Sequence, residues 1–138
     1  MAKVTEELLN RIKESADAGD FVRENEAAFL RVSPDDYMNR MMEKKGLRVA
    51  DVAARSGQGD YVYKVFSGRR RASRDVLIAI CFGMGLSLDE AQPLLRAAGF
   101  ARLDPRNRRD SVIIYGLCHG VEIDEVNDIL FELGESTL

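Results

Sequence analysis

The segment from residue 47 to residue 80 constrains the fold of this chain more than any other, because glycines divide it into short helical stretches. The first stretch carries apolar side chains at helical spacing, at Val49, Val52 and Ala53. The sequence Ser-Gly-Gln-Gly at 56–59 interrupts it, and a second stretch extends from about residue 60 to residue 67, before Gly68. Two short helices joined by a glycine turn are the layout of a helix-turn-helix.

An arginine run and a third helix follow this pair. Arg69, Arg70 and Arg71 come directly after Gly68, and Ser73 is expected to cap a helix. That helix is strongly apolar, with core positions at Val76, Leu77, Ile80 and Cys81. It would hold the first two helices at a fixed angle, so that the short second helix could enter the major groove of DNA.

The charges of the chain are segregated, although the net charge is only −3. Residues 55–74 hold six basic side chains and one acid, Asp60, whereas residues 122–138 hold six acids and no base. The positive excess on the helix-turn-helix is the polarity that a polyanion-binding surface needs. We interpret the acidic segment as a solvated face, and the arginine run as a set of phosphate contacts.

Composition predicts an all-α protein that folds as one globular unit. The 138 residues are 46% apolar, and no stretch alternates apolar and polar residues for long enough to indicate a strand. No apolar run approaches the roughly 18 residues of a membrane span, and the first 13 residues indicate a charged amphipathic helix instead of a secretory signal. We therefore expect a cytoplasmic protein without membrane contacts, and a reduced, buried role for Cys81 and Cys118.

Capping signals divide the remaining chain into helices. A first helix is expected to begin at Thr5, and a second at Asp20 with the apolar residues Phe21, Val22, Phe29 and Leu30. Ser33 and Pro34 begin a third helix, which ends at Gly46. The expected organisation is an N-terminal helical extension (1–32), a core that contains the helix-turn-helix (33–99) and a C-terminal helical hairpin packed on that core (100–138).

The C-terminal hairpin has a counterpart within the core. A shift of 35 residues aligns residues 74–99 with residues 109–134 without a gap, and eight of the 26 positions are identical. Each copy contains an Arg-Asp start, a glycine stop, an Asp-Glu pair at the next helix start and a closing glycine. The match predicts a duplicated hairpin that stacks on the first copy. The alternative is that two unrelated helical hairpins share the same capping chemistry.

The sequence gives no support to an enzyme. The single histidine, His119, precedes Gly120 at an expected helix end, where a cationic ring suits the helix dipole. No nucleophile motif and no phosphate-cradling glycine loop is present. We expect no catalytic residues, no metal site and no cofactor.

Residues 37–95 resemble the helix-turn-helix domain of the phage-repressor and Cro class, the XRE family of bacterial transcriptional regulators. The resemblance is carried by the apolar positions of the two short helices, by Gly68 with its arginines, and by the sequence Gly-Leu-Ser-Leu-Asp-Glu at 85–90. It implies a compact five-helix domain with the lambda-repressor fold, usually dimeric, that places its third helix in the major groove of an operator.

The resemblance also implies which residues contact DNA. Counting back from Gly68, the candidates for reading bases are Gln58, Asp60, Tyr61, Tyr63 and Lys64. Glutamine can pair with adenine, lysine with guanine, and aspartate with cytosine. The candidates for binding phosphates are Arg69, Arg70, Arg71, Ser73 and Arg74. Ser56 falls where the family has its turn glycine, so that the turn is one residue shorter than usual.

Two functions remain open at the level of the sequence. The first is sequence-specific binding of double-stranded DNA by a transcriptional regulator, which could act as a homodimer. The second is a protein-interaction module that kept the repressor-like scaffold, no longer reads DNA and holds an acidic protein partner. A packing role for Tyr61 is also open, and so is the role of Arg106, Arg108 and Arg109, which could extend the phosphate surface or neutralise the acidic segment.

Overall fold

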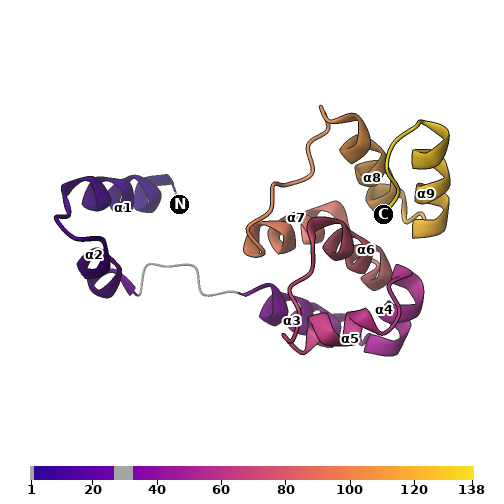
Figure 1. Ribbon diagram of the computed structural model, residues 1–138, viewed down its shortest axis with the longest axis horizontal. Helices are drawn as coiled ribbons and strands as arrows, with labels where there is room; N and C mark the ends of the chain where they lie inside the picture. The colour runs from indigo at the N-terminus through magenta and orange to yellow at the C-terminus, as the bar shows by residue number, and fades with distance from the viewer. Residues whose placement is uncertain (1, 27–32) are drawn as a thin grey trace. The chain divides into compact units, whose positions relative to one another are not determined.

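The computed structural model describes residues 2–26 and 33–138, and these residues fold into helices without any strand (Figure 1). The expectation of an all-α protein is confirmed. Contacts divide the chain into two compact units, Met1–Arg31 and Val32–Leu138. The prediction that the chain folds as a single globular unit is therefore wrong. The apolar fraction of a chain does not tell where along the sequence its contacts fall.

The N-terminal unit contains the helices α1 (Ala2–Glu14) and α2 (Ala18–Glu24). The Asp17 carboxylate accepts a hydrogen bond from the Asp20 backbone N–H at 2.9 Å, so α2 begins before the predicted cap at Asp20. The predicted start of α1 at Thr5 is likewise too late. Phe21 is buried in this unit, whereas Phe29 and Leu30 lie outside the described residues.

The second unit begins with five helices: α3 (Pro34–Lys45), α4 (Val49–Ser56), α5 (Tyr61–Phe66), α6 (Arg74–Met84) and α7 (Leu88–Ala97). The predicted serine caps are confirmed, since Ser33 and Ser73 each accept a backbone N–H three residues further on. The predicted stop of α3 at Gly46 is confirmed too, with φ of 65°. Side chains from all five helices form one apolar core, which includes Met38, Val52, Val65, Ile80 and Leu94.

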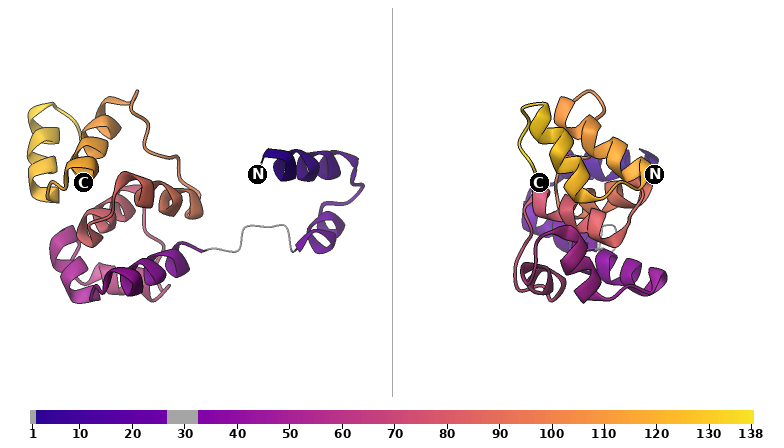
Figure 2. Two further views of the ribbon diagram at one scale, coloured as in Figure 1. Left: turned by 180° about the vertical axis from the view of Figure 1, so that it is seen from behind. Right: turned by 90° about the vertical axis from the view of Figure 1, so that its right-hand side faces the viewer.

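The last two helices, α8 (Arg108–His119) and α9 (Ile123–Glu132), form a hairpin that contacts α6 and α7 (Figures 1 and 2). Its helix α9 begins and ends 35 residues after α7 does. His119 ends α8 before Gly120, as expected, and its ring lies 4.2 Å from the ring of Tyr115.

The two cysteines differ in exposure. Cys81 is buried in the core, and burial raises the pKa of its thiol to about 12. Cys118 is exposed on α8, so the prediction that both thiols are buried is wrong for this residue. An apolar helix that covers a core on one side still has an opposite face, and Cys118 lies on that face.

None of the described helices has both the length and the apolar character needed to cross a membrane.

Candidate nucleic-acid interface

Helix α4 packs closely on α6 because α6 has a glycine at the contact. A Cβ atom at Gly83 would lie 2.7 Å from the Val52 carbonyl oxygen and 3.1 Å from the Ser56 Cβ atom. Ser56 is fully buried there, and its hydroxyl donates to the Ala53 carbonyl oxygen at 3.2 Å. This contact fixes the angle of α4, the first helix of the predicted helix-turn-helix, against the apolar helix α6.

The turn between α4 and α5 is formed by two glycines in left-handed conformations. Gly57 has φ of 73° and Gly59 has φ of 58°. Ser56, which the family pattern would place at the turn, is the last residue of α4 instead. Gln58 is half-buried, and its backbone N–H donates to the Ser56 hydroxyl oxygen at 3.3 Å. The turn is thus held by local hydrogen bonding to the end of α4.

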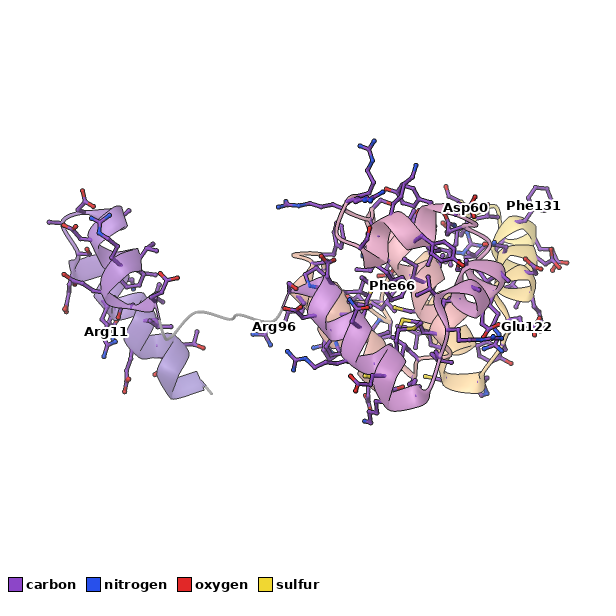
Figure 3. The ribbon with its side chains drawn as sticks, turned by 90° about the horizontal axis from the view of Figure 1, so that it is seen from below. Arg11, Asp60, Phe66, Arg96, Glu122 and Phe131 are labelled. Carbon is purple, nitrogen blue, oxygen red and sulfur yellow. The ribbon has the colours of Figure 1, made fainter. Side chains whose placement is uncertain are left out.

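Asp60 occupies the cap position of α5 without a capping hydrogen bond from its side chain. Its carboxylate is exposed at the rim of the turn (Figure 3). A negative charge at this place would be repelled by phosphates, unless it accepts a hydrogen bond from a cytosine amino group.

Helix α5 presents one polar side to solvent and one apolar side to the core. Val62, Val65 and Phe66 are buried, and Phe66 points into the interior of the unit (Figure 3). Tyr63 and Lys64 are exposed, with 47% of the Tyr63 surface accessible. Both are therefore free to contact the edges of bases.

Tyr61 has a different position from Tyr63. Its ring is half-buried against the core, and its hydroxyl donates to the Arg71 carbonyl oxygen at 3.3 Å. This hydrogen bond ties the loop that follows α5 back to the first turn of the helix. The packing role left open for Tyr61 accordingly describes its environment better than a base contact does.

The arginine loop leaves α5 through Gly68, which has φ of 77°. The backbone N–H groups of Arg69 and Arg70 both donate to the Lys64 carbonyl oxygen, at 3.0 and 3.2 Å. The side chains of Arg69, Arg70 and Arg71 are exposed, and none of them forms an ion pair within the described part of the chain. A fixed backbone thus presents three guanidinium groups without acidic partners.

Two further candidates on this segment already have partners. Ser73 is exposed, but its hydroxyl oxygen accepts from the Val76 N–H at 3.2 Å as the cap of α6. Arg74 donates to both carboxylate oxygens of Asp110, at 3.2 and 3.0 Å, and to the carbonyl oxygens of residues 101 and 102. We therefore separate Arg74 from the phosphate candidates, because a bidentate, half-buried ion pair leaves its guanidinium no free side for DNA.

The second basic cluster is also paired within the chain. Arg109 donates to both oxygens of Asp75, at 2.8 and 3.1 Å, while Arg106 pairs with Asp104 and Arg108 with Glu135. These arginines neutralise nearby acids, which favours the second of the two roles considered for them. Within residues 47–74, the bases without an ion pair are those of α4, α5 and the loop: Arg55, Lys64, Arg69, Arg70 and Arg71.

One acid lies beside the arginine loop although the sequence did not predict it there. A Cβ atom at Gly68 would lie 2.9 Å from a carboxylate oxygen of Asp35, so Asp35 in the first turn of α3 lies against the arginine loop. The sequence contained no signal for this contact, since the two residues are 33 positions apart and belong to different motifs.

The described side chains form no group of three or more histidines, cysteines and acids that could hold a metal ion. The chain matches no model of a known protein family, no curated protein and no solved structure.

Proposed function

We propose that this protein binds double-stranded DNA in a sequence-specific manner through α4, α5 and the arginine loop, as a bacterial transcriptional regulator of the helix-turn-helix type. In this proposal α5 lies in the major groove. Gln58, Tyr63 and Lys64 read bases, and Arg69, Arg70 and Arg71 hold phosphates on the groove edge. Tyr61 positions the loop.

One observation carries the proposal: three consecutive arginines without an acidic partner directly follow α5, the short helix that exposes Tyr63 and Lys64. Arg74 lies three residues after the loop, and Arg106, Arg108 and Arg109 form the second basic cluster, yet each of these four is paired with an acid. The chain has a net charge of −3, so the three arginines are not unpaired for lack of acidic residues. Three adjacent unpaired guanidinium groups on an anchored loop are better explained as a binding surface for a polyanion than as an ordinary solvated surface.

The test is the selection of duplexes from a random DNA pool at two salt concentrations. We expect a recovered motif of a few base pairs and an affinity that falls steeply as salt rises, because phosphate binding releases condensed counterions. Replacement of Arg69, Arg70 and Arg71 by alanine should weaken binding to every sequence. It should also reduce the slope of log affinity against log salt by about 0.9 for each phosphate that the variant no longer neutralises.

The matched control is the replacement of Arg96, Arg106 and Arg108 by alanine, which removes the same charge away from α5. It should leave the salt slope close to that of the wild-type protein. Replacement of Gln58 or Lys64 by alanine should instead change the preferred sequence. The proposal fails if the loop variant and its control bind DNA equally well.

A pool with no enriched sequence would favour the other candidate function, a protein-interaction module. The exposed Asp60 carboxylate and the exposed Tyr63 ring are the observations that suit it. The partner would then be an acidic protein held by the same three arginines.

A further inference from the structure

The α6–α7 hairpin and the α8–α9 hairpin form the same side-chain hydrogen bonds at equivalent positions, 35 residues apart. Arg74 donates to the carbonyl oxygens of residues 101 and 102, and Arg109 donates to those of residues 136 and 137. Gln92 exchanges two hydrogen bonds with the backbone of Leu103, and its counterpart Asn127 does the same with Leu138. Each hairpin with its following segment is therefore built in the same way.

The contact between the two hairpins is reciprocal. Arg74 of the first hairpin binds Asp110 of the second, and Arg109 of the second binds Asp75 of the first. Under the 35-residue shift Arg74 corresponds to Arg109 and Asp75 to Asp110. An arginine and an aspartate at equivalent positions therefore form the same ion pair twice, as equivalent residues do across the two-fold axis of a symmetric dimer.

The packing follows the same rule as the ion pairs. Helix α6 contacts α9, and in the equivalent way α7 contacts α8. The equivalent residues Ile78 and Ile113 are both buried in one core cluster. A Cβ atom at Gly116 would lie 2.9 Å from the Phe82 ring, so α8 approaches α6 closely.

Because α6–α7 pairs with its duplicate in a two-fold arrangement, a second copy of α6–α7 placed there would present the same arginine and aspartate. In the α6–α7 hairpin, Arg74 of one molecule would find Asp75 of another, just as it finds Asp110 within the chain. That surface is occupied in the folded chain, and the occupant brings no second helix-turn-helix with it. Only residues 98–107, which contain no helix, separate α7 from α8.

We propose that the α8–α9 hairpin takes the place of a second subunit on α6–α7. The protein is then a monomer with one reading head, and its DNA target is a single site without two-fold symmetry. The statement about DNA rests on the function proposed above. The statement about the monomer rests on the hairpins alone.

The first test is the mass of the full chain in solution and the symmetry of the selected DNA. Light scattering over a range of protein concentrations should give 15.4 kDa, the mass of one chain. The selected motif should lack an inverted repeat, and one protein should bind each duplex. A wild-type dimer, or a palindromic motif with two chains bound, overturns the proposal.

The second test opens the internal contact while leaving α6 unchanged. The double variant Arg109→Gln, Asp110→Asn removes both cross-hairpin ion pairs but keeps Arg74 and Asp75. We expect its mass to rise towards twice the monomer value with concentration. Further replacement by Arg74→Gln and Asp75→Asn should abolish this association, because the dimer would use those two side chains. The control variant Arg108→Gln, Glu135→Gln removes an ion pair that lies within the C-terminal segment and does not reach α6, and it should stay monomeric.

A folded double variant that remains monomeric would contradict the self-complementary contact. Should the double variant unfold, the wild-type mass and the symmetry of the selected motif decide. If the wild-type chain is a monomer that retains no DNA, the DNA-binding function fails, while the masses of the variants still test the pairing of the hairpins.

Discussion

At the scale of single residues, arginine serves two purposes in this chain, and its contacts distinguish them. Arg74 and Arg109 each give a bidentate hydrogen bond to a carboxylate and further hydrogen bonds to carbonyl oxygens. Such a guanidinium has exchanged its water for fixed acceptors and stabilises the fold. Arg69, Arg70 and Arg71 remain in water, where they add nothing to the core but are available to a ligand.

Asp60 places an exposed negative charge beside the candidate base-reading residues, so under the proposed function its removal should favour DNA binding. The variant Asp60→Asn keeps the shape of the side chain and deletes a negative charge at the rim of the turn. We expect affinity for every sequence to rise by about twofold or more at low salt, and the gain to shrink at high salt, because a screened repulsion is removed. Titration of one labelled duplex at two ionic strengths measures this.

The control for this variant is Asp128→Asn, which deletes an exposed charge on α9 and should leave the affinity unchanged. A loss of preference for cytosine at one base pair, in place of a general gain, would mean that Asp60 reads a base.

At the scale of elements, local signals predicted the helices of the second unit well. Serine caps and left-handed glycines act within one or two turns of the backbone, so Ser33, Ser73 and Gly85 could be assigned from neighbouring residues. The start of α2 was missed because Asp17 and Asp20 are both competent caps, and only the fold decides between them.

The role of Arg74 could not be predicted from its neighbours, because its partner lies 36 positions away. Sequence proximity grouped it with the arginine loop. The internal repeat did contain the missing signal, since Arg-Asp starts both hairpins, but identity of two dipeptides does not tell whether the copies touch. The contact between Asp35 and the loop had no such signal at all.

The packing of α4 on α6 gives the second prediction, which concerns Gly83. A methyl group there would meet the Val52 carbonyl oxygen at 2.7 Å, and neither backbone can move without separating the two helices. We expect Gly83→Ala to lower the free energy of unfolding by about 1–3 kcal/mol, as overpacking does. Chemical denaturation measures the change in stability. DNA affinity should fall too, because α4 orients α5.

Cys118 provides a control for Gly83, since it occupies the equivalent position on α8 and is exposed. Cys118→Ala should change stability by no more than about 0.5 kcal/mol. Equal effects of the two substitutions would mean that α4 does not rely on the close approach to α6.

At the scale of the whole molecule, Glu90 connects parts of the second unit that are distant in sequence. Its carboxylate accepts from the Ser87 N–H at 3.0 Å and lies 3.1 Å from the Lys45 ammonium of α3. Its carbonyl oxygen accepts from the Tyr37 hydroxyl at 2.7 Å. The backbone hydrogen bond from Ser87, followed by the hydrogen bond and charge of Lys45, lowers the pKa of the Glu90 carboxyl despite its partial burial.

The lowered pKa of Glu90 predicts that its contribution to the stability of the fold depends on pH. A carboxyl group with a lowered pKa in the folded state stabilises the fold above its unfolded pKa of about 4.3, and this stabilisation is lost as the pH falls through the folded pKa. Glu90→Ala should therefore reduce the free energy of unfolding by about 1 kcal/mol at pH 7. The difference in the free energy of unfolding between this variant and the wild-type protein should narrow steadily in acid.

Glu90→Gln retains an acceptor for the Ser87 N–H and should lose less stability. Urea unfolding across this pH range measures both variants, and a gap that stays constant from neutral pH into acid would show that the charge of Glu90 does not connect α3 to α7.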